Sequence, residues 1–305
     1  MAALSDQVTK LVQHESGWLQ KVAQYAFQAP GKQVRSMLVF LGAGVCGGIT
    51  AKTLRGAVLV TLLHQVSLTH DDVVDEATHR RGKPSINVVW NNKVAVLLGD
   101  YLWAKSLHIA TQHQDYDLLA LIIETAQAMS QGELLQLAQA NDFDTTEKIS
   151  LDIIYQKTAQ LFGTCLAVGA ITAGASEVQV ANMRRAGTQI GMAFQLKDDW
   201  LDYGTENQGK PLGMDLKEGK LTLPLIHALK QAPAQQQREI LKTIKHARYH
   251  PRQHQEALDF VRQSPGMDYT RKIMLQYQKK ALKTLINTTP SSYQQALVTL
   301  IQQII

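Results

Sequence analysis

Residues 59–81 read LVTLLHQVSLTHDDVVDEATHRR, a long apolar run that ends in three aspartates and two arginines. The apolar positions recur at helical spacing without a breaker, which predicts a helix that begins near Thr53. Asp71 and Asp75 are one helical turn apart, so their carboxylates project from one face. Hard oxygen ligands beside guanidinium groups favour a phosphate-bearing substrate that brings Mg²⁺ with it. Taken alone, the pattern fits a solvated, charged helix end equally well.

The same spacing recurs in the stretch FQLKDDWLD at 194–202, again at the end of an apolar helical run. Its aspartates are Asp198, Asp199 and Asp202. Carboxylates at the C-terminal end of a helix oppose the helix dipole, and two such triplets close together would repel each other. A divalent cation removes this objection, because Mg²⁺ binds a few carboxylates together with water and phosphate oxygens. We therefore expect the two triplets to face each other across a diphosphate.

Composition and charge narrow the class of protein. The chain has 305 residues, of which 45% are hydrophobic and 19% charged, so it can bury a substantial core. The net charge of +5 and the pI of about 9.1 fit anionic ligands and are compatible with peripheral contact with a membrane. The basic residues form no dense block, which argues against a nucleic-acid partner.

The two cysteines and the N-terminus bear on the compartment. Cys46 and Cys165 lie far apart in apolar surroundings and are expected to be free thiols in a reducing compartment. The first residues lack the basic segment and apolar core of a signal peptide, and no apolar run approaches the ~20 residues that span a bilayer. A cytoplasmic protein is expected.

Helical periodicity runs through the chain, and no convincing alternation of period two indicates a sheet. We expect one all-α domain over residues 1–305. Before three or four further helices, the expected helical segments are 4–27, 94–112, 118–140, 146–174, 177–203 and 221–230. Gly42, Gly44 and Gly47 match GxGxxG, but no βαβ unit follows. A helix that ends in small residues is therefore preferred to a dinucleotide-binding turn.

Three basic segments accompany the acidic motifs. Residues 31–35, GKQVR, open a helix, where free N–H groups and the helix dipole favour phosphate, although a solvated loop is the alternative. Lys157 lies within a helix and either extends along the surface or contacts a ligand. Residues 204–220 are rich in glycine and charge, which suits a loop that closes over a diphosphate or a flexible surface loop.

Taken in order, these motifs resemble those of the all-trans polyprenyl diphosphate synthases. The resemblance covers most of residues 30–226 and is weak beyond them. The matching stretches are GKQVR at 31–35, HQVSLTHDDVVDEATHRRGKPS at 64–85, LLGDYL at 97–102, KTAQLFG at 157–163, FQLKDDWLD at 194–202 and GKPLGMDLKEGKLTLPLI at 209–226. The resemblance implies an all-α fold around a central cavity, usually in a dimer. It also implies condensation of an allylic diphosphate, such as farnesyl or geranylgeranyl diphosphate, with isopentenyl diphosphate.

The resemblance implies roles for the residues that match the family's motifs, with three Mg²⁺ ions when substrate is bound. The implied metal ligands are Asp71, Asp75, Asp198 and Asp202. The implied catalytic residues are Asp71, Asp72, Asp75, Asp198, Asp199 and Lys157. The positions that assist the allylic diphosphate are Arg80, Lys157, Thr158, Gln195, Lys210 and Lys220. The positions that hold isopentenyl diphosphate are Lys32, Arg35, His64 and Arg81.

The implied chemistry follows from charge. Neutralising the allylic diphosphate promotes ionisation of its C–O bond, and the double bond of isopentenyl diphosphate attacks the resulting cation. The proton then leaves to the departing diphosphate. Val66 and Ser67 lie about 6 to 7.5 Å before Asp71 along the helix, and neither is an aromatic residue that would block a growing chain. A product longer than C20 is expected, at about C30 to C40 by the same reasoning, for quinone side chains.

Departures from the family and competing interpretations are few. Pro30, Gln33 and Ser36 replace residues of the usual GGKR stretch and its following proline, which lowers the expected affinity for isopentenyl diphosphate. One alternative is a catalytic subunit that needs a small partner subunit, and another is a non-catalytic binding subunit. Non-catalytic subunits typically lose charged motif residues, whereas both triplets are intact here. A class I terpene cyclase is disfavoured, because its second motif normally contains Asn, Ser or Thr, and Glu.

Overall fold

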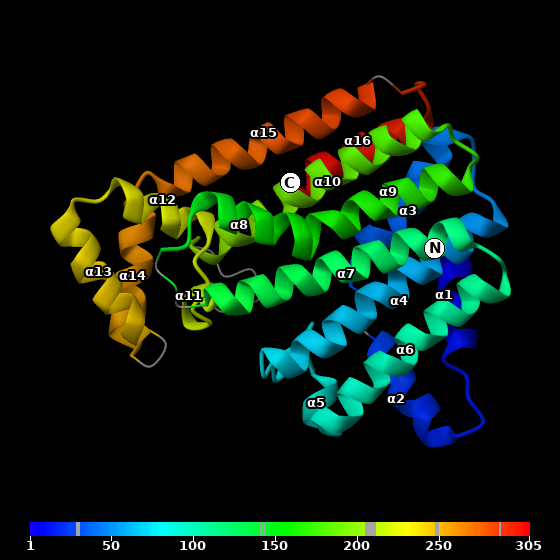
Figure 1. Cartoon of the computed structure of the whole chain (residues 1–305), viewed down its shortest axis with the longest axis horizontal. Coiled ribbons are helices and arrows are strands. Elements are labelled where there is room, and N and C mark those ends of the chain that lie inside the picture. Colours follow the sequence, from blue (N-terminus) through cyan, green and yellow to red (C-terminus); the bar gives the residue numbers. More distant parts are fainter. Residues whose placement is uncertain (29–30, 141, 143, 205–211, 248–249, 287) are drawn as a thin grey trace. The chain divides into compact units, whose positions relative to one another are not determined.

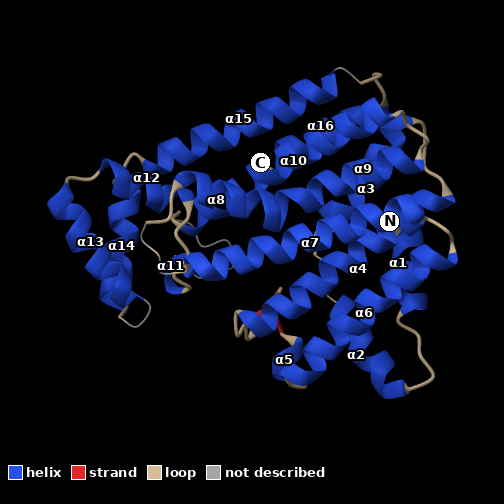
Figure 2. Cartoon of the chain, viewed as in Figure 1, coloured by secondary structure: helices blue, strands red, loops and turns tan. Residues whose placement is uncertain are grey.

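The computed structural model describes residues 1–28, 31–140, 142, 144–204, 212–247, 250–286 and 288–305. Helices make up nearly all of the secondary structure in this part of the chain (Figures 1 and 2). The exception is an antiparallel hairpin in which β1 (His79–Arg80) pairs with β2 (Lys83–Pro84). The expectation of an all-α protein is therefore confirmed, with a hairpin that residue periodicity did not predict.

The chain divides into two compact units. Unit 1 comprises Met1–Ala126, Thr164–Arg184 and Thr288–Leu297, and unit 2 comprises Gln127–Gly163, Arg185–Asn287 and Val298–Ile305. Four of the five divisions fall inside helices, namely α7 (Tyr116–Gln139), α9 (Gln160–Thr172), α10 (Glu177–Asp202) and α16 (Ser292–Ile304). That residues 1–305 act as one domain stays a prediction.

The other helices each belong to one unit. Besides the hairpin, unit 1 contains α1 (Ala2–Leu11), α2 (Gly17–Phe27), α3 (Val34–Cys46), α4 (Ala51–Val74), α5 (Ile86–Val89) and α6 (Asn92–Gln112). Unit 2 contains α8 (Glu147–Ile154), the π-helical turn η1 (Tyr155–Ala159), α11 (Met214–Lys217), α12 (Leu223–Gln231), α13 (Ala234–Ala247), α14 (Pro251–Arg262) and α15 (Gly266–Ile286). None of the described helices combines the length and apolar character that crossing a bilayer requires.

Helix α4 forms the centre of unit 1 and carries the first acidic motif. Residues 57–60 are each at most 1% exposed, and because successive residues turn by about 100°, the helix is covered on all sides there. It packs against α3 and lies beside α6 (Figure 1). Thr50 and Thr53 form a capping box at its start, where the Thr53 hydroxyl lies 2.9 Å from the Thr172 hydroxyl. The motif therefore sits at the end of a firmly held helix.

The GxGxxG match begins at Gly42, which lies where helix α3 contacts helix α9. On α3, a Cβ atom at Gly42 would lie 3.0 Å from the carbonyl oxygen of Leu166 in α9. On α9, a Cβ atom at Gly169 would lie 2.4 Å from the carbonyl oxygen of Val39 in α3. Glycine at both positions lets the two backbones approach closely. The interpretation of residues 37–48 as part of a helix that ends in small residues is confirmed.

The core of unit 2 holds the end of the second acidic motif. Leu225 of α12 and Leu258 of α14 are at most 2% exposed and belong to one apolar cluster with residues of α13. Tyr203, which follows the second motif directly, is completely buried in that cluster. Its backbone oxygen accepts a hydrogen bond of 2.9 Å from Nε of Arg262. The C-terminal end of α10 is therefore anchored in apolar surroundings.

Two expected segments differ from the structure. The sequence predicts one helical element over 4–27, which is wrong, because α1 and α2 are separate helices. The Ser16 side chain caps α2 by accepting from the Leu19 N–H, and the Ser16 N–H donates to Nδ1 of His14 at 2.9 Å. These local bonds compete with a continuous helix. The segment expected over 146–174 is helical, but the turn of η1 interrupts its α-helical bonding.

Candidate active site

In the first acidic motif, one carboxylate is buried and the other two are accessible. Asp72 is 3% exposed, and its Oδ1 accepts hydrogen bonds from Nε of Arg80 at 2.8 Å and from Nη2 at 2.5 Å. Burial raises the pKa of Asp72, and the Arg80 charge opposes the rise. Asp71 is half-buried, and exposed Asp75 caps the helix by donating its N–H to the Asp71 carbonyl at 2.8 Å. Asp72 therefore orients Arg80, while the other two carboxylates can receive a cation.

The β1–β2 hairpin positions the two arginines that follow the motif. The Asn87 side chain donates to the carbonyls of Asp72 and Ala77, each at 3.2 Å, which fixes the hairpin on the end of α4. Arg81 adopts φ 52° at the turn, in the left-handed region. A Cβ atom at Gly31 would lie 2.8 Å from Cζ of Arg81, so the basic loop at 31–35 and this guanidinium lie together.

A basic cluster of Arg35, His64 and Arg81 lies in unit 1. Nη1 of Arg35 lies 3.1 Å from Nε2 of His64. A guanidinium only donates, so Nε2 is the acceptor and the imidazole proton resides on Nδ1. Nδ1 is buried and has no hydrogen-bond partner among the described residues. Within the described part of the chain, Nδ1 is therefore a buried donor without an acceptor.

The surroundings keep His64 neutral. Burial and the charges of Arg35, Arg81 and Arg80 hold the pKa of His64 well below its usual range. A neutral imidazole that offers an N–H among three guanidinium groups is suited to an anion rich in oxygen acceptors. Lys32, the fourth residue expected at this place, is exposed at the start of the loop.

The second acidic motif is linked to η1 by a relay of hydrogen bonds. The Thr158 hydroxyl donates to Oε1 of Gln195 at 3.0 Å, and Nε2 of Gln195 donates to Oδ1 of Asp199 at 2.9 Å. Asp199 is 4% exposed, whereas Asp198 is exposed. Burial raises the pKa of Asp199 to about 7; the Gln195 hydrogen bond opposes the rise, and the charges of Asp198 and Asp202 add to it.

Asp202 holds the start of α11 through two backbone contacts. Its Oδ1 and Oδ2 accept from the backbone N–H groups of Met214 and Asp215, each at 3.1 Å. Each oxygen has a second lone pair, so these bonds are compatible with cation binding. Desolvation and the carboxylates of Asp199 and Asp202 hold the pKa of Asp215 well above its usual range. Sequence reasoning gave Asp215 no role, although it lies in the quoted GMD stretch.

Two lysines expected to assist a diphosphate are held by carboxylates. Nζ of Lys157 lies 2.5 Å from Oε2 of Glu133 and donates to Gln136 at 3.4 Å. Nζ of Lys220 lies 2.5 Å from Oε2 of Glu218. These ion pairs orient the ammonium groups, and neither partner was found from the sequence. Glu133 lies far from Lys157 in the chain, so no local pattern could have revealed it. Lys210 lies outside the described residues.

The π-helical turn has a close packing partner in α7. A Cβ atom at Gly132 would lie 2.7 Å from the backbone nitrogen of Lys157. Only a glycine lets η1 approach α7 this closely, which places Lys157 beside Glu133. Single π-helical turns are frequent at functional sites.

The described residues contain no place where three or more His, Cys, Asp or Glu side chains converge on a metal. Each acidic motif therefore offers only part of a coordination shell. This arrangement fits Mg²⁺, which keeps several waters and takes one or two carboxylates together with phosphate oxygens of a substrate.

The residues expected to set product length lie on α4. Val66 is 7% exposed, and the Ser67 hydroxyl donates to the His64 carbonyl at 2.9 Å. Both side chains are small.

Cys46 and Cys165 are free thiols, as expected, and burial raises the pKa of Cys165 to about 12.

The pKa of Asp199 predicts how the stability of the metal-free protein changes with pH. Its folded-state pKa of about 7 lies above the ordinary value of 3.8, so its contribution to stability is full below pH 3.8 and is lost as pH rises through 7. In EDTA, the melting temperature of the wild type should fall relative to that of Asp199→Asn as pH rises from about 4 to 7, as measured by circular dichroism at about ten pH values. Asp152→Asn, at an exposed position of α8, controls for loss of a carboxylate elsewhere in unit 2. A wild-type minus Asp199→Asn difference that does not change with pH would contradict this assignment.

Comparison with known proteins identifies the family. The sequence model described as polyprenyl synthetase matches residues 16–261. The chain is 36% identical over 302 residues to the all-trans-nonaprenyl-diphosphate synthase (geranyl-diphosphate specific) of Rhodobacter capsulatus, covering 98% of this chain and 92% of that protein. It is 38% identical over 231 residues to heptaprenyl diphosphate synthase component 2 of Geobacillus stearothermophilus, covering 75% and 72%.

A solved structure gives the same result for the fold. The decaprenyl diphosphate synthase from Rhodobacter capsulatus superimposes with a TM-score of 0.94 at 32% identity, covering 100% of this chain and 94% of that one. The all-helical architecture agrees with these matches. The chain therefore belongs to the polyprenyl synthetase family and is a prenyltransferase with the all-α isoprenoid synthase fold.

Proposed function

We propose that this chain condenses an allylic diphosphate with successive molecules of isopentenyl diphosphate, with both acidic motifs acting on the allylic diphosphate. The observation that carries the proposal is the basic cluster of unit 1, in which the N–H of neutral His64 lies among arginines and has no acceptor within the described residues. Such a donor fits a diphosphate that must be held without being cleaved. The accessible carboxylates of the two motifs complement it, since they suit a diphosphate that departs with metal.

We assign the metal to the accessible carboxylates Asp71, Asp75 and Asp198, with Asp202 assisting and three ions in the substrate complex. When bound, Mg²⁺ neutralises the allylic diphosphate and makes it a better leaving group. The buried carboxylates act on neighbouring side chains instead, since Asp72 orients Arg80 and Asp199 orients Gln195.

The cationic side chains act on the charge that develops as the allylic C–O bond ionises. Arg80 comes from the hairpin of unit 1, whereas Lys157 and Lys220 come from unit 2, each oriented by a carboxylate. Fixed cations stabilise developing charge strongly because they need not reorganise during the reaction. Thr158 and Gln195 hold the η1 turn to the second motif and so keep Lys157 in place.

We propose that His64 binds phosphate and does not act as the base that removes the final proton. The lone pair of Nε2 accepts from Arg35, and Nδ1 carries the proton. Each of its nitrogens therefore serves binding. The proton leaves instead to the departing diphosphate, which carries the oxygen bases needed.

We propose a product of about C30 to C40, because neither Val66 nor Ser67, which lie about 6 to 7.5 Å before Asp71 along α4, is an aromatic residue that would block a growing chain. Val66 and Ser67 are small, and relatives named for heptaprenyl, nonaprenyl and decaprenyl products support a long chain. Chains of this length serve as quinone tails. The allylic starter is farnesyl or geranylgeranyl diphosphate, with geranyl diphosphate as the alternative that one relative's name suggests.

We propose a homodimer in the cytoplasm as the active form. On α6, Val96 and Leu97 are 40% and 65% exposed, and on α7 Ile123 is 45% exposed. Exposed aliphatic side chains on a helix face favour contact with another chain. The free thiols favour a reducing compartment. The second candidate is a heterodimer with a small subunit, which the relative named component 2 favours.

Pyrophosphate release and product sizing test the proposal. The purified chain, given isopentenyl diphosphate and each of the three allylic starters, should release pyrophosphate only with Mg²⁺, and Asp71→Asn should lower the rate at least about a hundredfold. Chromatography of the dephosphorylated products should show mainly C30 to C40 chains. Products of mostly C15 or C20 would contradict the chain length. Absence of release, alone and with an added small subunit, would contradict the catalytic role.

Two substitutions of His64 should distinguish the roles of its two ring nitrogens. Asn places an N–H near the position of Nδ1, whereas Gln places its amide near Nε2, where it can still accept from Arg35. We expect His64→Asn to raise KM for isopentenyl diphosphate less than His64→Gln, with the allylic KM unchanged in both. Loss of a hydrogen bond to a charged group costs about 1.5 to 3 kcal/mol, or roughly ten- to a hundredfold in KM. The reverse order of the two variants would contradict the assigned tautomer.

A further inference from the structure

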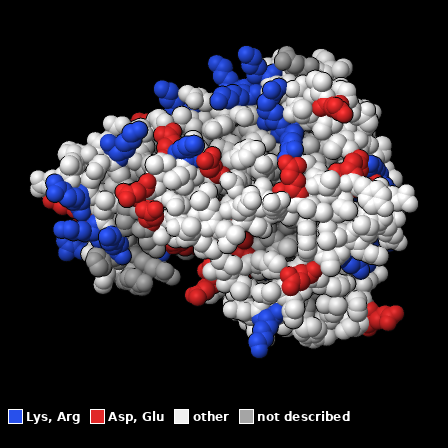
Figure 3. All heavy atoms as spheres, viewed as in Figure 1, with Lys and Arg blue, Asp and Glu red and all other residues white. Residues whose placement is uncertain are grey.

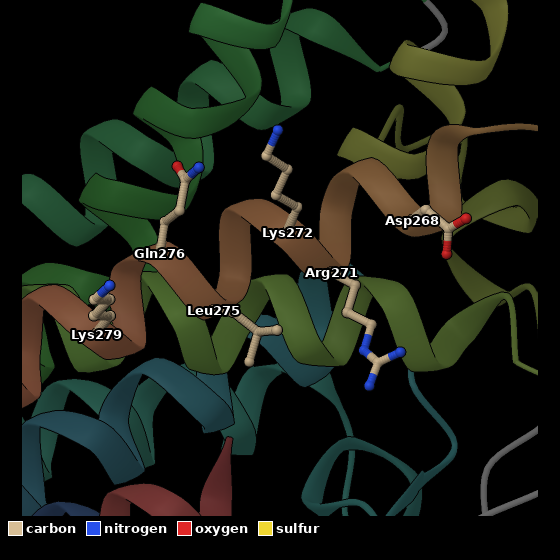
Figure 4. A pocket seen from close by; sticks show the side chains of 6 residues that line it. All are labelled: Asp268, Arg271, Lys272, Leu275, Gln276 and Lys279. Atoms are coloured by element: carbon tan, nitrogen blue, oxygen red, sulfur yellow. The ribbon is translucent and has the colours of Figure 1, made fainter.

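The outer face of α15 in unit 2 carries a stripe of cations around exposed apolar side chains. Residues at helical spacing form a shallow depression of about 460 Å³ on this face, and Figure 4 shows the side chains projecting from one helix. Its lining residues are Asp268, Arg271, Lys272, Leu275, Gln276 and Lys279. At 100° per residue, Lys283 and Ile286 continue the same stripe. We call these eight residues the α15 stripe.

The α15 stripe is strongly positive. It contains four cations, Arg271, Lys272, Lys279 and Lys283, and one anion, Asp268, so four minus one leaves a net charge of +3. Lys280 is exposed at its edge. None of the four cations has a salt-bridge partner within the described part of the chain. Figure 3 shows basic side chains gathered on the surface over α15.

Two exposed aliphatic side chains belong to this positive stripe, Leu275 near its middle and Ile286 at its C-terminal end. Leu275 is 44% exposed and Ile286 is 70% exposed. The opposite side of α15 holds it to the protein through Met274, Ala281 and Leu285, each at most 6% exposed. The stripe is thus the free face of an amphipathic helix whose inner face is already used. From Asp268 to Ile286 it extends about 27 Å along a straight element.

We propose that the α15 stripe docks this protein on the surface of an anionic lipid bilayer. Basic side chains near such a surface are attracted to its headgroups, and exposed aliphatic side chains between them enter the boundary with the acyl chains. A straight, shallow stripe matches a planar partner. Binding to lipid is a separate property from the proposed condensation reaction, and it can be measured without substrate or turnover.

The pattern favours a membrane over the other polyanionic or apolar partners. A single-stranded nucleic acid is bound through aromatic stacking platforms, and the α15 stripe contains no aromatic residue. A second copy of the same stripe would oppose four cations with four cations. An anionic bilayer is the partner that uses both the charge and the two aliphatic side chains.

Vesicle sedimentation of the full chain tests the proposal. Binding to vesicles of phosphatidylcholine with about a third phosphatidylglycerol should exceed binding to phosphatidylcholine alone and fall steeply at high salt, because surface charge is screened. The double variant Lys272→Glu with Lys279→Glu should lower the partition coefficient at least about twentyfold, since each cation contributes about fivefold. Leu275→Ser with Ile286→Ser should weaken binding even at constant charge. Circular dichroism checks that each variant folds.

A matched control distinguishes the contribution of the α15 stripe to lipid binding from that of net charge. Lys10→Glu with Lys21→Glu changes the net charge equally at exposed positions of α1 and α2, and it should leave most of the binding intact. Equal loss in both double variants, or no preference for anionic vesicles, would overturn the proposal. Tighter binding to a single-stranded oligonucleotide at matched salt, or a smaller sedimentation coefficient of the α15 variant without lipid, would also overturn it in favour of a nucleic-acid or self-association surface.

Discussion

Burial of the middle aspartate in each acidic motif is the constraint on which the site depends. In a helix, consecutive residues point about 100° apart, so Asp72 cannot share the outward direction of Asp71, nor Asp199 that of Asp198. The buried member in each case finds a partner within the protein, Arg80 for one and Gln195 for the other. An unpaired buried carboxylate would be costly, so these partners are fixed in place. Each motif thereby presents accessible carboxylates beside an oriented donor.

The same pairing of buried groups explains the basic cluster. Arg35 occupies one nitrogen of His64, and this single contact decides both the tautomer and the chemistry of the other nitrogen. The surrounding guanidinium groups keep the imidazole uncharged, which leaves a directional donor in a positive environment. This arrangement is the basis for proposing that the cluster holds the diphosphate of isopentenyl diphosphate. In the proposed function, the basic cluster and the two acidic motifs therefore act on different substrates.

Much of this was visible in the sequence, because it depends on local periodicity. The repeated DDxxD spacing and the apolar runs before each copy placed Asp71, Asp75 and Asp198 at helix ends. The break between α1 and α2 was missed, since the hydrogen bonds of Ser16 compete with a helical pattern that looks continuous. The split of each triplet into buried and accessible members was also missed. It depends on which side of the helix the rest of the protein covers.

Long-range partners could not be predicted at all. Glu133 holds Lys157, and Gly132 lets the π-helical turn approach, but neither leaves a local signal near Lys157. The hairpin of two-residue strands is too short for any alternation to show. Resemblance to the family located Lys157 and Arg80, yet only the structure shows that carboxylates orient them. The sequence therefore located these two side chains, whereas their orientation depends on contacts that only the structure shows.

A double-mutant cycle of Asp71→Asn and Asp198→Asn tests the central claim, that both motifs act on the same allylic diphosphate. Single-turnover rates of ionisation would be measured for the wild type, both single variants and the double variant at saturating Mg²⁺. If the motifs act as one unit, the double variant is scarcely slower than the slower single variant, a coupling of more than about 1 kcal/mol. Losses that multiply in full would show that the motifs act independently and would contradict the account.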